Sequence, residues 1–68
     1  MKIEDLVSGK REEEIIQIRG VSVPVWALKR LSGEGYSHVR PYPENKTLSL
    51  WGKTCSGCFT EEELKEKG

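Results

Sequence analysis

The sequence predicts a small α+β domain in which a three-stranded antiparallel sheet packs against a central helix, with short terminal helices. Three observations support this class: a β-branched run over residues 14–23, a helical pattern between Pro24 and Gly33, and an alternating stretch over residues 47–51. Because a chain of 68 residues can bury only one modest core, we expect a single domain spanning residues 1–68.

The N-terminal third is expected to hold a short helix and then a strand. Ile3, Leu6 and Val7 recur at helical spacing, and a Ser-Gly pair follows as a stop signal. After a polar stretch, Ile16 and Ile18 alternate with polar neighbours inside the β-branched run. We therefore expect one half-buried strand over residues 14–23.

The central helix is bounded by proline and glycine. Pro24 suits the first turn of a helix and Gly33 suits its end. The hydrophobic spacing directs apolar side chains inward and leaves Lys29 and Arg30 on the exposed side near the C-terminal end, where the helix dipole favours cations.

Residues 36–51 are expected to form a β-hairpin. Pro41 and Pro43 remove two backbone donors, so the first arm must be an edge or irregular strand. The segment 44–46 supplies the turn, with Asn45 suited to positive φ. The second arm alternates cleanly over residues 47–51.

A capping signal predicts a last helix that begins near residue 61. Thr60 is a natural N-cap, Glu63 completes a capping box, and Phe59 can pack on Leu64 as a hydrophobic staple. Together these elements predict a core made of Ile16, Ile18, Val25, Leu28, Leu31, Val39, Leu48, Leu50 and Phe59.

Charge is balanced overall but is not evenly distributed. Eleven basic and eleven acidic residues are present; residues 1–14 carry three basic and five acidic side chains, residues 15–54 six and two, and residues 55–68 two and four. The basic centre fits a surface that meets a polyanion, and equally fits acidic ends that fold over a basic body.

The chain has no apolar run long enough to cross a bilayer and no signal-peptide pattern at its start. We therefore expect no membrane association and a cytoplasmic, reducing setting. In that setting a CxxC pair is more often metal-binding or catalytic than a structural disulfide.

Cys55 and Cys58, the only cysteines, form one CxxC whose intervening Ser-Gly is expected to be a small turn. Zinc is one interpretation, with His38 as third ligand, or with two chains of a homodimer sharing four thiolates. A CxxC thiol redox role is another, although the acidic helix start nearby opposes a thiolate. The remaining interpretations are a disulfide and two small buried side chains at a strand-to-helix corner.

Catalytic patterns are otherwise absent, so we expect that the protein is not an enzyme. His38 is the single histidine and Asp5 the single aspartate, which leaves little for a nucleophile-base-acid arrangement. Gly52-Lys53-Thr54 matches the tail of a phosphate-binding loop, but the earlier glycine of that motif is missing.

Basic and aromatic side chains interleave along the hairpin and its flanks. In a strand, Tyr36, His38, Arg40 and Tyr42 would share one side. Such a surface suits base stacking combined with phosphate contacts, and exposed aromatics equally suit docking of a protein. We therefore expect a small binding or regulatory module for which nucleic acid is favoured, with a protein-protein adaptor or inhibitor as the alternative. The candidate ligand-binding residues are Lys29, Arg30, Tyr36, Arg40, Tyr42, Lys46, Trp51 and Lys53.

Overall fold

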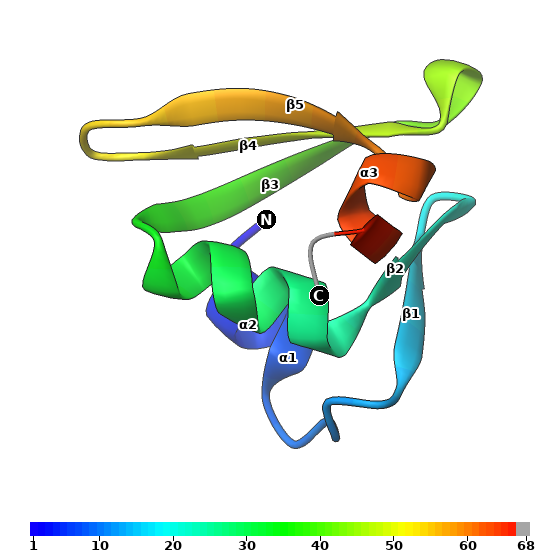
Figure 1. Cartoon of the computed structure of the whole chain (residues 1–68), viewed down its shortest axis with the longest axis horizontal. Helices are drawn as coiled ribbons and strands as arrows, with labels where there is room; N and C mark the ends of the chain where they lie inside the picture. Colours follow the sequence, from blue (N-terminus) through cyan, green and yellow to red (C-terminus); the bar gives the residue numbers. More distant parts are fainter. Residues whose placement is uncertain (67–68) are drawn as a thin grey trace.

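A computed structural model of the chain describes residues 1–66 and confirms the small α+β fold (Figure 1). Within these described residues, a two-stranded sheet and a three-stranded sheet, both antiparallel, combine with three α-helices and a short 3₁₀ turn. The elements are α1 (Ile3–Val7), β1 (Ile15–Ile18), β2 (Val21–Pro24), α2 (Val25–Gly33), β3 (Tyr36–Tyr42), η1 (Pro43–Asn45), β4 (Thr47–Gly52), β5 (Ser56–Thr60) and α3 (Glu61–Glu66). Among the described residues, no helix is long and apolar enough to span a membrane.

The β-branched run near the N-terminus is a hairpin, so the prediction of one continuous strand over residues 14–23 was wrong. β1 and β2 pair with Ile18 opposite Val21, which leaves Arg19 and Gly20 as a two-residue turn. Both turn residues have positive φ, 50° and 89°. These angles are typical of the type I′ turn, whose twist matches that of the flanking strands. Gly20 was the overlooked signal, because it supplies one of these angles at no steric cost.

The central helix α2 follows the prediction closely. It begins directly after Pro24 and ends at Gly33. Its buried side chains are Val25, Ala27, Leu28 and Leu31.

The predicted hairpin of residues 36–51 is present as β3 and β4, but the third strand of its sheet is β5. β4 pairs with β3 on one side and with β5 on the other, so it is the central strand. The expected turn at Ser56-Gly57 is therefore extended strand. The turn after β3 also differs in detail, because Lys46 rather than Asn45 adopts positive φ, 50°.

The C-terminal capping signal is confirmed at the start of α3. The backbone N–H of Glu63 donates a hydrogen bond to Oγ1 of Thr60 at 3.2 Å. Thr60 Oγ1 in turn donates to the Glu63 carboxylate at 3.4 Å. The backbone N–H of Ser22 donates to the Glu61 carboxylate at 2.7 Å, which ties β2 to the first turn of this helix.

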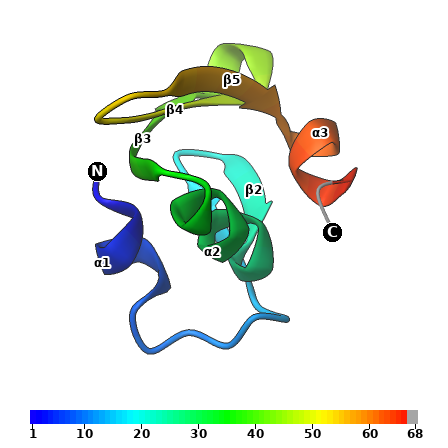
Figure 2. The same ribbon diagram turned by 60° about the vertical axis from the view of Figure 1, so that its left-hand side comes forward.

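The core lies between the three-stranded sheet and the other elements. Figures 1 and 2 show α1, α2, α3 and the β1–β2 hairpin on the same side of the β3–β4–β5 sheet. Most predicted core residues are buried, whereas Ile16 and Phe59 are partly buried and pack against the cluster. The prediction missed Ile3, Val21, Val23, Ala27 and Leu64.

Candidate functional site

One side of the three-stranded sheet is not covered by any other element within residues 1–66 (Figure 1), and we call this side the outer face. Val39, Leu48 and Leu50 are fully buried, so their strand neighbours project the opposite way. Strand register aligns these neighbours in rows across the sheet. The outer-face residues are His38, Arg40, Tyr42, Thr47, Ser49, Trp51, Ser56, Cys58 and Thr60.

The outer face carries no carboxylate side chain among its residues, which are basic, aromatic or small and polar. Across the wider stretch from residue 36 to residue 60, Glu44 is the single acidic residue. The Glu63 carboxylate contacts the outer face at one corner, where it accepts a hydrogen bond from Thr60, so an anionic ligand would meet least repulsion away from that corner.

His38 and Trp51 form a ring pair at one end of the outer face. They are cross-strand partners, and their rings stack with centroids 5.6 Å apart and planes inclined by 9°. Ser37 supports the pair, since its Oγ lies 2.8 Å from Nδ1 of His38 and donates to the Trp51 carbonyl at 3.5 Å. The indole remains 37% exposed. Its partner on β5 is Ser56, which has a small side chain.

Arg40 and Tyr42 form the second part of the site. The guanidinium carbon of Arg40 lies 5.9 Å from the centroid of the Tyr42 ring, which is within cation–π range. Among residues 1–66 the single ion pair joins Arg30 to Glu34, so no carboxylate neutralises Arg40. A ligand that carries an anionic group and a ring could therefore contact both side chains, with its anionic group at Arg40 and its ring at Tyr42.

Tyr36 does not join the outer face, contrary to the strict two-residue alternation expected for its strand. Tyr36 pairs with Gly52 and His38 pairs with Trp51, so Ser37 is an extra residue that forms a bulge. The bulge turns Tyr36 inward, where its ring makes an edge-to-face contact with Phe59 at 6.0 Å. Tyr36 is therefore a core-packing residue.

The basic side chains of the central helix are also separated from the outer face. α2 lies on the core side of the sheet, and its buried positions face the core. The exposed Lys29 and Arg30 consequently point away from the sheet. Arg30 is additionally paired with Glu34 at 3.8 Å.

The two remaining predicted lysines lie at opposite ends of the β4 strand. Lys46 donates a hydrogen bond from Nζ to the carbonyl of Gly20 at 3.2 Å. This bond holds the β1–β2 turn against the end of the β3–β4 hairpin. Lys53 lies in the turn between β4 and β5, beyond Trp51.

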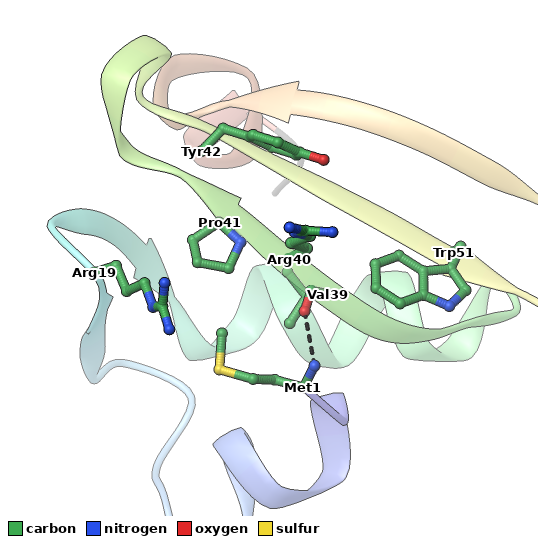
Figure 3. A pocket seen from close by; sticks show the side chains of 7 residues that line it. All are labelled: Met1, Arg19, Val39, Arg40, Pro41, Tyr42 and Trp51. Atoms are coloured by element: carbon green, nitrogen blue, oxygen red, sulfur yellow. Dashed lines mark hydrogen bonds between the residues drawn. The ribbon is translucent and has the colours of Figure 1, made fainter.

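A groove beside β3 adds a residue that the sequence analysis did not single out. Figure 3 shows Arg19 from the β1–β2 turn across the groove from Arg40 and Trp51, with Met1 below them. The groove has a volume of about 410 Å³. Only the packing of the two hairpins brings Arg19 here, because it is twenty-one positions from Arg40 in the sequence.

The CxxC pair does not form a turn with converging sulfurs. Cys55 precedes β5 and Cys58 lies within it, so their Cα atoms are about 10 Å apart at the usual rise of a strand. A disulfide needs Cα atoms within ~7 Å. Both thiols are free, Cys58 is exposed and Cys55 is half-buried, so the interpretation as two buried side chains was wrong.

Metal ligands are likewise not gathered in this fold. Within residues 1–66, no three His, Cys, Asp or Glu side chains lie close enough together to hold a metal ion. Zinc on Cys55, Cys58 and His38, and its shared form in a homodimer, stay sequence predictions without support from the geometry.

Comparison with known proteins gave no relative: no family model matches the chain, and no curated protein and no solved structure matches it significantly.

Proposed function

We propose that this protein is a small non-enzymatic binding module whose outer face binds nucleic acid. The observation that carries the proposal is the combination on one open sheet face of two exposed aromatic rings, Trp51 and Tyr42, with Arg40, which forms no ion pair within residues 1–66. Aromatic side chains on a sheet offer a stacking surface to bases, and each stacked base contributes about 1–3 kcal/mol.

Charge distribution also favours a polyanion over a neutral ligand. None of the outer-face residues is acidic, the Glu63 carboxylate reaches this face only at Thr60, and the acidic residues are concentrated toward the two ends of the chain. Phosphate groups would meet Arg40 and Lys53 without displacing an existing ion pair on either side chain among the described residues. The cytoplasmic setting expected from the sequence suits such a ligand and remains part of this proposal.

The test is a titration of the purified domain with labelled oligonucleotides at two salt concentrations, about 50 and 200 mM. Binding should weaken steeply with salt, because each neutralised phosphate releases counterions and adds about 0.7–0.9 to the slope of log affinity against log salt. Arg40→Ala should weaken binding, whereas Arg30→Ala, which removes the same charge from the opposite side of the molecule, should not.

The protein-adaptor function is the competing proposal. Exposed Trp51 and Tyr42 are also the side chains that anchor protein interfaces. Absence of oligonucleotide binding at low salt, or binding indifferent to the double variant Arg40→Ala with Lys53→Ala, would reject nucleic acid and favour a protein partner.

A further inference from the structure

Two hollows run along the edge of β3, one on each side of the point where the N-terminal residues pair with this strand. Met1 and Val39 exchange backbone hydrogen bonds of 3.0 and 2.8 Å, and Lys2 forms an isolated antiparallel β-bridge with His38. The first hollow is the groove of Figure 3, and the second has a volume of about 580 Å³. Met1 lines the first and Lys2 lines the second.

The stacked ring pair marks the boundary between the hollows. Trp51 lines the first hollow and His38 lines the second. Because the two rings stack with centroids 5.6 Å apart, a ligand in either hollow meets one ring of the same pair. A ligand that is long enough can contact both.

Each hollow is lined by two basic side chains. Arg19 and Arg40 line the first, and no described residue that lines it is acidic. Lys2 and Lys53 line the second, together with one carboxylate, Glu4. None of the four cations is in an ion pair among residues 1–66, where the single pair is Arg30 with Glu34.

Cations in two successive hollows, with aromatic rings between them, match a chain of phosphates that carries bases. A mononucleotide has its phosphates at one end and would use one hollow. Bases in a duplex are stacked on each other and cannot reach rings that stand along a groove, whereas the bases of a single strand can.

We propose that the β3 edge is a track for single-stranded nucleic acid, with Arg19 and Arg40 binding phosphate in the first hollow and Lys2 and Lys53 binding phosphate in the second. This inference rests on the proposed function and names its ligand class. Trp51 stacks on a base between the two phosphate sites. Arg19, which the sequence did not indicate, is thereby a phosphate-binding residue.

The experiment compares one sequence as single-stranded DNA, as single-stranded RNA and as duplex DNA, using fluorescence anisotropy on the intact chain. At least one single strand should bind more tightly than the duplex by about 5- to 150-fold, the range that stacking of one base supplies. A single strand long enough to cross both hollows should also bind more tightly than a mononucleotide.

The variants Arg19→Asn and Lys53→Ala test the two ends of the track. Asparagine tolerates the positive φ of position 19 and forms a favoured Asn-Gly turn, so Arg19→Asn removes the charge without straining the hairpin. Each variant should weaken single-strand binding and lower the salt slope by about 0.7, the contribution of one phosphate on a single strand. Arg30→Ala is the control.

The outcomes separate the track from the proposed function. Equal binding of duplex and single strands, together with Arg19→Asn behaving like Arg30→Ala, would overturn the track and leave nucleic-acid binding by the outer face standing. A mononucleotide that binds as tightly as the long single strand would also overturn the track. No binding of any probe at low salt would overturn both.

Discussion

The imidazole of His38 and the indole of Trp51 stack across strands β3 and β4, with centroids 5.6 Å apart and planes inclined by 9°. The pair holds the indole in a fixed position although this side chain is 37% exposed. A ring that is already ordered loses less conformational entropy when a ligand stacks on it.

Trp51→Ala should therefore weaken oligonucleotide binding by about 1–3 kcal/mol, the usual contribution of one stacked base. Stability should also fall, because the aromatic pair contributes about 0.5–1.5 kcal/mol in addition to the burial of the indole. His38→Ala is the matched comparison: it removes the support but keeps the indole, so its effect on binding should be smaller. Unchanged affinity of Trp51→Ala in an anisotropy titration would contradict the proposed site.

The fluorescence of Trp51 should report ligand binding directly. Trp26 is the second tryptophan and packs partly against the core, away from the outer face. In a Trp26→Phe variant, addition of a single-stranded oligonucleotide should change the emission of the remaining indole and reduce its quenching by acrylamide. Emission and quenching that stay constant through saturation would show that the ligand binds elsewhere.

Gly52→Ala should destabilise the domain, because the backbone of Gly35 and Tyr36 lies against this position. A Cβ on Gly52 would collide with the carbonyl oxygen of Gly35 and lie 3.3 Å from Cα of Tyr36. Overpacking against backbone typically costs about 1–3 kcal/mol. Urea denaturation followed by circular dichroism measures the effect.

Gly33→Ala is the control for this variant. A Cβ there would meet nothing within 4 Å, and the residue ends α2 without positive φ. Its stability should be unchanged or slightly raised, since alanine in a helix is favoured over glycine by up to about 1 kcal/mol. If Gly52→Ala and Gly33→Ala changed the free energy of unfolding equally, β3 and β4 would not be in the register described.

The cysteines should react as two independent thiols. Cys58 is exposed on the outer face, while Cys55 is half-buried with its Sγ 3.4 Å from the position of a Cβ on Gly35. Labelling of the native protein should therefore be faster in Cys55→Ser, which retains Cys58, than in Cys58→Ser. Mild oxidation should give no intramolecular disulfide while β5 stays extended.

Cys58→Ser also tests the sequence prediction of zinc. As a surface substitution away from the core, it should change stability by less than about 0.5 kcal/mol. A structural zinc site would instead couple metal loss to unfolding. Zinc in protein purified without chelator, together with unfolding of Cys58→Ser, would contradict the free-thiol arrangement.

The sequence by itself determined the elements whose signals are local. Pro24 and Gly33 bounded the central helix, the alternation around Leu48 defined β4, and Thr60 with Glu63 defined the start of α3. Each of these signals acts within a few residues, through a fixed φ, a side-chain period or a capping hydrogen bond. The presence of basic and aromatic residues on one strand face was also predictable, since His38, Arg40 and Tyr42 keep their two-residue spacing.

Tertiary structure decided which residues share the site. The bulge at Ser37 turned Tyr36 into the core, because strand register is set by pairing with β4 and not by β3 alone. The strand β5 formed where the CxxC spacing had indicated a turn, because pairing with the edge of β4 satisfies its backbone groups. Arg19 reached the groove beside Arg40 because Lys46 and Gly20 join the ends of two hairpins. No local pattern encodes that contact, since it depends on how two separately folded hairpins pack across one core.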